Sequence, residues 1–582
     1  MARGGHGPGD LMDKTGIARV LDQMASLMEL KGENTFRVRA FKTASRALAG
    51  LPEDVETALA DGTLAATRGI GPAILQIITD LARTNRSPVY EELREVVPPG
   101  LVEMLEISGL GVAKVRLIHE RLGIESLGDL EVAARDGRLA GLPGFGPRTC
   151  DNVVRGLARL RRAATFRLLH HAAREAEELR AALEQLPGVR QAFIAGDVRR
   201  RVELVREVVI VLLAEVPPAD VLRGLAAVPG VDELAGQDER RATLRFAGGT
   251  VAQVVVTPPV NLGMVLLQAT GSQGHLARLA EHAERRGYTL QGAALWRGSQ
   301  FVPTPDEAAV YTALGLPEFP PELREDRGEF ERYVAGVPRL VAADDLRGFL
   351  HCHTDFSDGS NSVEELARAC RAAGYSYLGI TDHSAASAYA GGLRAEDLQA
   401  QWDAVDAVNG RIDGIRVLKG IEVDILPSGE LDYGGDVLRG FDFVIASIHS
   451  HFTLPEPQMT ARLLRAMDSP YTTIIGHPTG RLLLARDGYP VDLAAVFRRA
   501  AERGVALEIN ADPHRMDLDW RVLGEARAAG ALISIGADAH SVAGLDNVIL
   551  GVGVARKAGL GPEDILNTRT VEEFMAFAGA RR

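Results

Sequence analysis

The spacing of apolar positions divides the chain into regions of different predicted structure. Apolar residues recur at helical spacing in IARVLDQMASLMEL and FRVRAFKTASRALAGL, and short Gly and Pro breaks separate such stretches over residues 11–165. We therefore expect an all-helical N-terminal region, divided into residues 1–85 and 86–165.

Residues 166–260 have a mixed pattern. The runs QAFIAGDVRR and VVIVLLAEV predict strands, TLRFAGGTVAQVVVT predicts two more, and helices lie before and between them. Residues 261–325 return to helix and short strands. The proline-rich, charged segment LPEFPPELREDRGEFE has no amphipathic period and indicates a linker, which we place at residues 326–345.

The C-terminal region has a third pattern. From about residue 346, apolar runs such as YLGITDH, FDFVIASIHS, YTTIIGHP, VALEIN and LISIGADAH alternate with helical stretches. This alternation predicts a β/α barrel with one parallel sheet over residues 346–582.

Composition agrees with a multidomain globular protein. The chain has 582 residues, of which 46% are hydrophobic and 25% charged, and no uninterrupted apolar stretch is long enough to span a bilayer. The opening MARGGHGPGD has no apolar signal core. The three cysteines, Cys150, Cys352 and Cys370, lack paired spacing and indicate neither a disulfide framework nor a cysteine zinc site. We expect a cytoplasmic monomer with no membrane partner.

Charge is unevenly distributed along the chain. The net charge is −13, yet residues 1–170 hold 23 Lys and Arg against 21 Asp and Glu. The N-terminal third is therefore the better candidate for contacting nucleic-acid phosphates.

An internal repeat supports that assignment. TRGIGPAILQII, ISGLGVAKVRLIHERLGI and LAGLPGFGPRTCDNVVRGL share a Gly-apolar-Gly turn before an apolar-periodic helix. The unit resembles the helix-hairpin-helix motif, in which backbone N–H groups grip DNA phosphate without reading sequence. One copy alone could be just a tight turn between helices, but three copies favour a DNA-binding role. The predicted DNA contacts are Gly69, Gly71, Gly109, Gly111, Gly144 and Gly146, together with Arg37, Arg39 and Lys42, which fit a 5′-phosphate site or a solvated helix face equally well.

Potential metal ligands follow almost every predicted barrel strand. The strand C-termini of a β/α barrel meet on one face, so these side chains are expected in one bowl. In His-x-His the alternation of a strand places both imidazoles on one side and Cys352 on the other, in the core. A single histidine at a strand end usually has a structural role. Nine potential ligands at such positions favour a metal site instead. The candidates are His351, His353, Asp358, His383, Glu422, His449, His477, Asp538 and His540.

This set resembles the PHP (polymerase and histidinol phosphatase) family over residues 346–582. The resemblance implies a distorted (β/α)7 barrel in which these nine residues are the catalytic metal ligands of two to three Zn²⁺, Mn²⁺ or Fe ions. Nine nitrogen and oxygen ligands are too many for one ion, and clustered ions suit phosphoester hydrolysis. His451, Asn510 and Arg515 are phosphate contacts or loop-packing residues.

The order of regions resembles bacterial family X DNA polymerases with a C-terminal PHP domain. The resemblance implies a helical 8-kDa-like domain with the first hairpin (1–85), a fingers-like domain with two hairpins (86–165), a nucleotidyltransferase-like palm (166–260) and a thumb-like domain (261–325). Residues that match the family's nucleotide site are Gly196, Arg199, Arg200, Glu207, Thr270, Gly271 and Ser272.

The palm departs from the family at its catalytic positions. The expected Ser is Asp197, two catalytic aspartates fall on Glu207 and Val209, and the third falls on Ala252, unless the register of this match is shifted. Valine and alanine cannot ligate the two Mg²⁺ ions that polymerisation requires, so Mg²⁺ is not expected at the palm. Template-directed synthesis is expected to be absent or very weak.

Lyase chemistry is not expected either, because it needs a lysine amine. The family's lysine positions hold Ala73 and Ile77 here, with Arg37 at the remaining one. Three functions remain: a DNA-repair exonuclease and phosphoesterase acting on gapped, nicked or 3′-ended DNA, a gap-filling polymerase with the barrel as editor, and a DNA-binding scaffold with structural metals. A structural zinc needs only four ligands, which argues against the scaffold.

Overall fold

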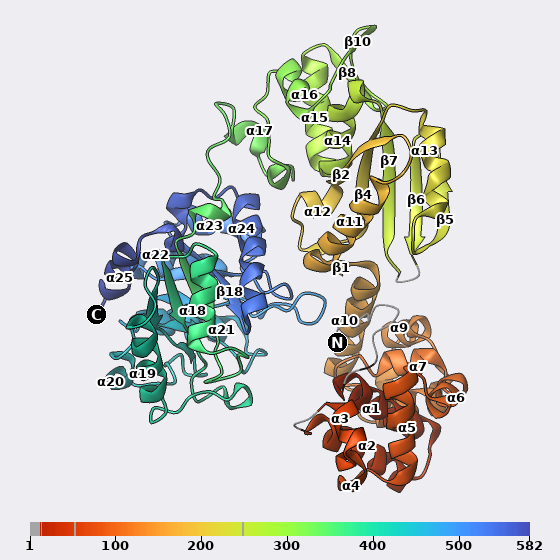
Figure 1. Cartoon of the computed structure of the whole chain (residues 1–582), viewed down its shortest axis with the longest axis vertical. Helices are drawn as coiled ribbons and strands as arrows, with labels where there is room; N and C mark the ends of the chain where they lie inside the picture. Colours follow the sequence, from red (N-terminus) through yellow and green to blue (C-terminus); the bar gives the residue numbers. More distant parts are fainter. Residues whose placement is uncertain (1–11, 13, 52–53, 247–248) are drawn as a thin grey trace. The chain divides into compact units, whose positions relative to one another are not determined.

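The computed structural model describes residue 12 and residues 14–51, 54–246 and 249–582 (Figure 1). The chain forms two compact units, Met1–Thr165 and Phe166–Arg582. The start of the predicted 1–85 domain lies outside the described residues. Within the described ranges, no helix is long and apolar enough to cross a membrane. The domain limits inside each unit stay predictions.

The first unit is helical in all the parts that the structure describes, as the periodicity predicts. Its apolar faces share one core that includes Leu21, Phe41 and Ile78. The helices are α1 (Lys14–Lys31), α2 (Thr35–Ala49), α3 (Val55–Ala60), α4 (Thr63–Ala66), α5 (Pro72–Thr84), α6 (Pro88–Val96), α7 (Pro99–Met104), α8 (Val112–Leu122), α9 (Leu127–Arg135) and α10 (Pro147–Thr165).

The three repeated Gly-apolar-Gly segments form three similar turns. The first glycine of each, Gly69, Gly109 and Gly144, has φ of 101°, 87° and 81°, a conformation that favours glycine. The second glycine directly precedes α5, α8 or α10. A Cβ at Gly71 or Gly111 would meet no atom within 4 Å, so the turn faces open surface at the N-terminus of a helix.

The second unit begins with a five-stranded sheet of order β2-β4-β7-β6-β5. Its strands are β2 (Val189–Ala195), β4 (Val208–Ala214), β5 (Val231–Gln237), β6 (Arg241–Phe246) and β7 (Val251–Thr257), and only β4 and β7 pair in parallel. The helices α11 (Leu169–Leu183) and α13 (Pro218–Gly224) contact this sheet. The predicted strands of the palm-like region are present, but the end of QAFIAGDVRR forms the short helix α12 (Gly196–Arg199) and β5 is an additional strand.

The thumb-like region follows as helices and a small antiparallel sheet. It contains α14 (Leu262–Thr270), α15 (Gln273–Arg285), β8 (Tyr288–Gln291), β9 (Ala294–Arg297), β10 (Gln300–Val302) and α16 (Glu307–Leu314). The segment predicted as a linker is more ordered than its composition suggests. It contains α17 (Glu329–Arg332) and buries Tyr333, Leu340 and Val341.

The C-terminal part is a curled parallel sheet of order β13-β12-β11-β18-β17-β16-β15-β14. Its strands are β11 (Gly348–Cys352), β12 (Tyr377–Ile380), β13 (Arg416–Lys419), β14 (Glu422–Asp424), β15 (Ile445–Ser447), β16 (Ile474–Ile475), β17 (Ala506–Asn510) and β18 (Ile533–Ala539). The two end strands, β13 and β14, are consecutive in the chain, and a bridge between His383 and Glu422 continues β12 towards β14. The sheet therefore closes as seven strand positions, which confirms the distorted (β/α)7 barrel.

Helices surround the barrel, as the alternating pattern predicts. They are α18 (Val363–Ala372), α19 (Leu398–Asn409), α20 (Gly435–Leu438), α21 (Glu456–Asp468), α22 (Leu493–Arg503), α23 (Trp520–Ala528), α24 (Val548–Lys557) and α25 (Val571–Gly579). Cys352 is fully buried, with Sγ 3.4 Å from the Gly379 carbonyl oxygen, so its thiol lies in the core as expected.

Candidate metal centre

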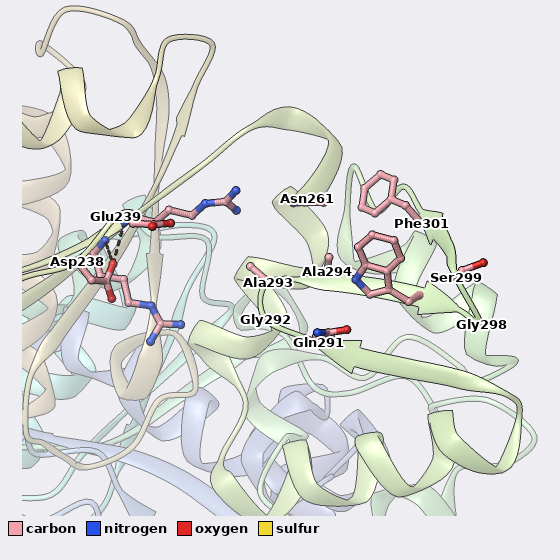
Figure 2. A pocket seen from close by; sticks show the side chains of 13 residues that line it. Asp238, Glu239, Asn261, Gln291, Gly292, Ala293, Ala294, Gly298, Ser299 and Phe301 are labelled. Atoms are coloured by element: carbon pink, nitrogen blue, oxygen red, sulfur yellow. Dashed lines mark hydrogen bonds between the residues drawn. The ribbon is translucent and has the colours of Figure 1, made fainter.

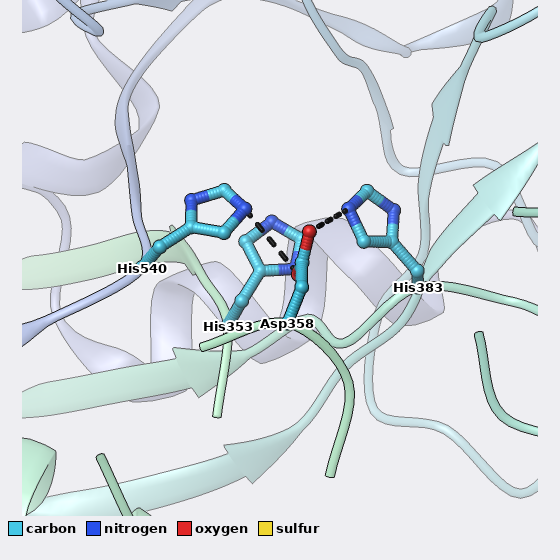
Figure 3. Close-up of side chains that lie close together, drawn as sticks. All are labelled: His353, Asp358, His383 and His540. Carbon is cyan, nitrogen blue, oxygen red and sulfur yellow. Dashed lines mark ion pairs between the residues drawn. The ribbon is translucent and has the colours of Figure 1, made fainter. Parts of the chain in front are cut away.

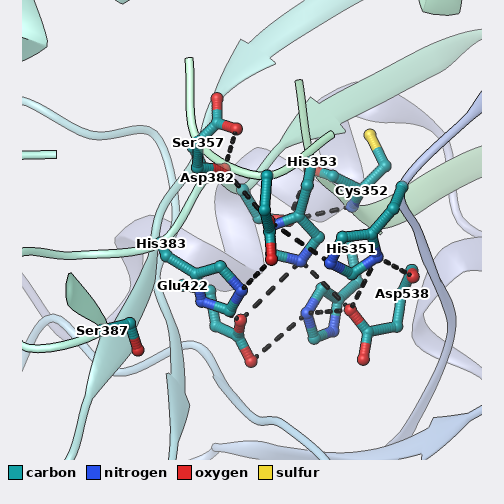
Figure 4. A network of polar contacts seen from close by, with 12 residues as sticks. His351, Cys352, His353, Ser357, Asp382, His383, Ser387, Glu422 and Asp538 are labelled. Atoms are coloured by element: carbon teal, nitrogen blue, oxygen red, sulfur yellow. Dashed lines mark hydrogen bonds and ion pairs between the residues drawn. The ribbon is translucent and has the colours of Figure 1, made fainter. Parts of the chain in front are cut away.

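The nine candidate ligands lie together at the C-terminal ends of the barrel strands. Figure 4 labels five of them: His351, His353, His383, Glu422 and Asp538. His351 lies in β11 and His353 follows it, so both imidazoles reach the same site. Glu422 begins β14, and Asp538 lies near the end of β18. The convergence that parallel strands impose thus brings together residues almost two hundred positions apart.

Three overlapping groups of these side chains have geometry that could hold a metal ion. Within each group one atom per residue lies within 4.8 Å of all the others. His353 and His383 each belong to two groups, which therefore form one continuous centre. The groups are His353, Asp358, His383 and His540 (Figure 3); His351, His353 and Asp538; and His383, Glu422 and His449.

Glu422 lies at the middle of the centre. Its Oε1 is 3.0 Å from His477 Nε2 and 3.3 Å from His351 Nε2, and its Oε2 is 2.9 Å from His383 Nδ1. Burial raises the pKa of this carboxyl, but the positive charges of His449 and His351 outweigh burial and hold the pKa well below its usual range. A fully buried carboxylate thus carries its charge where a cation would lie.

The imidazoles around it differ in pKa because their neighbours differ. Burial lowers the pKa of His449, but Glu422 and Asp424 outweigh burial and raise it to about 10. Burial also lowers the pKa of His540, and Asp358 and Asp538 raise it to about 9. Burial and the Arg515 charge lower the pKa of His477 to about 4.

The donor set fits divalent ions. Imidazole nitrogens and carboxylate oxygens are the ligands of Zn²⁺, Mn²⁺ and Fe sites. Several of these atoms are buried without a hydrogen-bond partner among the described residues, which is costly unless something else ligates them. These atoms are His351 Nε2, His353 Nδ1, His383 Nδ1, His477 Nδ1 and Glu422 Oε2. His351 Nε2 and His383 Nδ1 lie close to Glu422 oxygens, but without the geometry of a hydrogen bond.

The backbone is strained at three of the ligand positions. His351, His477 and Asp538 have φ of 73°, 27° and 52°, values that non-glycine residues seldom adopt. Each costs about 1–3 kcal/mol and persists only when the surroundings fix it. The register of β11 against β18 also shifts between Leu350 and Cys352. The sheet therefore fixes these side chains in conformations that the local chain does not favour.

Buried carboxylates behind the ligands were missed by the sequence analysis. Glu508 Oε1 lies 2.6 Å from His351 Nδ1, and Glu508 Oε2 accepts the His477 backbone N–H at 2.7 Å. Asp424 Oδ1 lies 3.3 Å from His449 Nδ1 and Asp424 Oδ2 accepts the Ser387 hydroxyl at 2.5 Å. A carboxylate bound to one ring nitrogen orients the other towards a metal. The available signal was Glu508 itself, an acid within the apolar run VALEIN.

The three predicted phosphate contacts have different environments. Arg515 Nε lies 3.5 Å from Asp538 Oδ2. The Asn510 amide donates to Asp538 Oδ2 at 3.0 Å and to Glu508 Oε2 at 3.2 Å, which positions those carboxylates. His451 is exposed, and no contact links it to the centre within the described ranges.

In the palm-like region, the two matched arginines are bound to neighbouring side chains. The Arg199 guanidinium donates to the Glu307 carboxylate at 2.6 Å and to Thr270 Oγ1 at 3.1 Å. Arg200 pairs with Glu325 at 2.8 Å and with Asp197 at 2.5 Å. Gly196 starts α12 (Gly196–Arg199), Gly271 follows α14, and the Ser272 hydroxyl caps α15 by accepting from the His275 N–H at 3.1 Å.

The third catalytic position needs a correction. Ala252 is fully buried in the core, whereas Gln253 lies opposite Val209 in the β4–β7 ladder and donates to Glu207 Oε2 at 2.9 Å. Gln253, and not Ala252, therefore occupies the face that Glu207 shares. Val209 packs in an apolar cluster with Val265 and Leu266 of α14.

A separate hollow of about 1010 Å³ opens between the tip of the β5–β6 hairpin and the small thumb-like sheet. Figure 2 shows Asp238 and Glu239 on one side of it and Phe301 and Ser299 on the other. None of the matched nucleotide residues lines this hollow.

Two of the predicted DNA-contacting cations in the first unit are already in ion pairs. Arg37 pairs with Glu33 and Lys42 with Glu29, each at 2.8 Å, while Arg39 is exposed. The glycine turns, whose second glycines face open surface at helix N-termini, are therefore the clearer candidates for anion binding in this unit.

Comparison with protein families defines the class. The PHP domain family matches residues 350–512, a helix-hairpin-helix domain matches residues 12–87, a SAM-like helix-hairpin-helix tandem matches residues 101–159, and the DNA polymerase beta thumb matches residues 265–325. Together with the site, these matches define a multidomain DNA-binding enzyme with a metal-dependent PHP domain.

Two kinds of curated relative agree with this class. The chain is 34% identical over 570 residues to the DNA polymerase/3′-5′ exonuclease PolX of Bacillus subtilis (strain 168). The alignment covers 97% of this chain and 99% of that protein. The chain is 31% identical over 243 residues to a probable phosphatase of Shewanella halifaxensis (strain HAW-EB4), covering 40% of this chain and 92% of the relative. The chain therefore belongs to the PolX family of DNA polymerases that carry a PHP domain.

Proposed function

We propose that the chain acts as a monomeric, metal-dependent 3′–5′ exonuclease and phosphoesterase on DNA, and that the barrel is the catalytic domain. The observation that carries this proposal is the convergence of nine candidate nitrogen and oxygen ligands, most of them buried, on one centre. We propose that they hold two to three Mn²⁺, Zn²⁺ or Fe ions. When bound, such ions supply a nucleophilic water at neutral pH and neutralise charge on the phosphate.

The chain's own residues would position the substrate and the ligands. Glu508 and Asp424 hold the outer ring nitrogens of His351 and His449, so the opposite nitrogens face the centre. Arg515 supplies a guanidinium beside Asp538 that could bind a phosphate oxygen. The helix-hairpin-helix turns and the thumb would bring gapped, nicked or 3′-ended DNA to the barrel.

We further propose that template-directed synthesis is weak or lost. Val209 is packed among aliphatic side chains and Gln253 is an amide, so the carboxylate on this face of the β4–β7 ladder is Glu207. Two Mg²⁺ ions need more carboxylates than that. Arg199 and Arg200, which could meet a triphosphate, are neutralised by Glu307, Glu325 and Asp197.

A gap-filling polymerase with an editing barrel is the second candidate. The Bacillus subtilis relative favours this candidate, because its name gives it both DNA polymerase and exonuclease activity and it aligns over nearly the whole chain.

One assay separates the candidates. Pure protein is incubated with Mn²⁺ and a 5′-labelled gapped duplex, with and without nucleotides. We expect shortening, and nucleotide-dependent lengthening would instead support the polymerase. His351→Ala should abolish shortening while DNA binding remains, whereas His282→Ala in α15 should shorten normally. Asp538→Asn serves as a second site variant, and melting curves check that each variant is folded. Undiminished shortening in both site variants would place the chemistry outside the barrel.

A further inference from the structure

The loop that follows β12 has a fixed backbone beside the metal centre. The Leu393 N–H donates to the His383 carbonyl at 2.8 Å, and the Gly392 N–H donates to the Ser387 carbonyl at 3.2 Å. Ser387, labelled in Figure 4, is fully buried, and its hydroxyl donates to Asp424 at 2.5 Å. The loop therefore presents whatever side chain it exposes in a defined place.

The side chain that it exposes is aromatic. Tyr389 lies in a short 3₁₀ turn (Ala388–Ala390) and is 76% exposed, while its neighbour Ala390 is buried. Its ring centroid is 6.5 Å from that of the ligand His383, at an angle of 50°. The ring thus lies beside a candidate ligand with most of its surface open to solvent, at the mouth of the centre.

Packing does not account for this tyrosine. A residue so exposed contributes little to the core, and the other large apolar side chains exposed in the described part of the barrel, Val542 and Ile549, are aliphatic and less exposed. A flat aromatic face held next to a phosphoesterase centre matches the flat face of a nucleobase, and such stacking accepts every base.

We propose that Tyr389 forms a nucleobase subsite, on which the base of the 3′-terminal nucleotide stacks while its phosphodiester lies in the metal centre. The inference rests on the proposed function and makes it more specific. A simple phosphate monoester has no ring to stack, so the subsite assigns the barrel to nucleotide ends. Arg515 lies on the phosphate side of this arrangement, next to Asp538.

The test compares two 5′-labelled DNA strands that differ only at the 3′ end. One ends in an ordinary nucleotide and the other in a tetrahydrofuran residue without a base. The wild-type protein, loaded with Mn²⁺, should show a KM about tenfold lower for the strand with the base, within the usual range for stacking on one aromatic ring. Tyr389→Ala should reduce this preference to about one.

Two variants complete the design. Tyr389→Phe keeps the ring and should keep the preference, whereas Ile549→Ala truncates another exposed apolar side chain of the barrel and should also keep it. Full preference in Tyr389→Ala, or its loss in Tyr389→Phe, which would assign the effect to the hydroxyl, overturns the subsite. If the wild-type protein shortens neither strand, the proposed function fails first and the subsite falls with it.

Discussion

At the scale of single residues, the centre depends on groups that would never touch a metal ion. Glu508 is buried at 1% exposure, contacts His351 through one oxygen and accepts the His477 N–H through the other. Burial raises the pKa of its carboxyl, and the His351 charge opposes that effect. Two ligands thus share one orienting carboxylate.

We predict that Glu508→Gln lowers the affinity for Mn²⁺ or Zn²⁺ by about 10- to 100-fold, the usual effect of losing an orienting partner. The amide keeps the size of the side chain but cannot hold the proton of His351 Nδ1 in the same way. Isothermal titration calorimetry with Mn²⁺ or Zn²⁺ measures the change in metal affinity. Glu502→Gln, an exposed residue of α22, is the matched control, and equal affinities in the two variants would contradict the orienting role.

At the scale of elements, the backbone geometry of the helix-hairpin-helix turns suits the binding of DNA phosphate. The second glycine of each turn has open space around it, so its lack of a side chain serves no packing purpose within the described chain. A ligand that approaches the backbone closely would explain the glycine, and DNA phosphate at a helix N-terminus is such a ligand.

Gly111→Ala should therefore weaken binding to duplex DNA by about 2- to 10-fold, equivalent to one net hydrogen bond, with little change in melting temperature. The added methyl group would stand between the backbone N–H groups and the phosphate. Fluorescence anisotropy with labelled duplex measures this. Gly141→Ala, another glycine with open space around it, should bind as the wild-type chain does. Equal binding by both variants would remove the turn from the interface.

Much of this architecture can be predicted from the sequence, because strand ends and glycine turns leave local signals. The nine candidate ligands follow apolar runs, and parallel strands bring such positions together. The role of Gln253 could not be predicted, since it depends on which residue of β7 pairs with Val209. Tyr389 likewise lies in a loop with no distinctive period, which only the folded chain brings to the centre. Asp424, by contrast, follows Glu422 by two residues in β14, so the alternation of a strand places both on one face. The buried Tyr333 and Leu340 of the predicted linker pack by tertiary contact alone.

At the scale of the second unit, polar contacts join the palm-like sheet to the barrel. The Trp520 indole N–H donates to Glu203 Oε2 at 3.2 Å, and the Lys557 ammonium donates to the Arg200 carbonyl at 3.0 Å. Lys557 is buried at 4% exposure and also pairs with Glu325. Burial lowers the pKa of Lys557, and Glu325 partly offsets that effect. These contacts make the two parts one compact unit.

Lys557→Met should lower the free energy of unfolding of this unit by about 1–3 kcal/mol, because it leaves buried acceptors without their donor. Lys419→Met removes a lysine whose partner Asp406 is exposed, and it should cost less than about 1 kcal/mol. Urea unfolding monitored by tryptophan fluorescence compares the two. Equal, small effects would show that the junction contributes little to stability.

The central claim is that residues far apart in the sequence form one multinuclear centre that hydrolyses DNA ends. Anomalous diffraction from crystals of the Mn²⁺-loaded chain tests it most directly, because it locates the ions themselves. We predict two or three peaks enclosed by His351, His383, His449 and Asp538 and their neighbours, and their loss in His351→Ala. A single peak outside the barrel, or none in a preparation that still shortens DNA, would contradict the account.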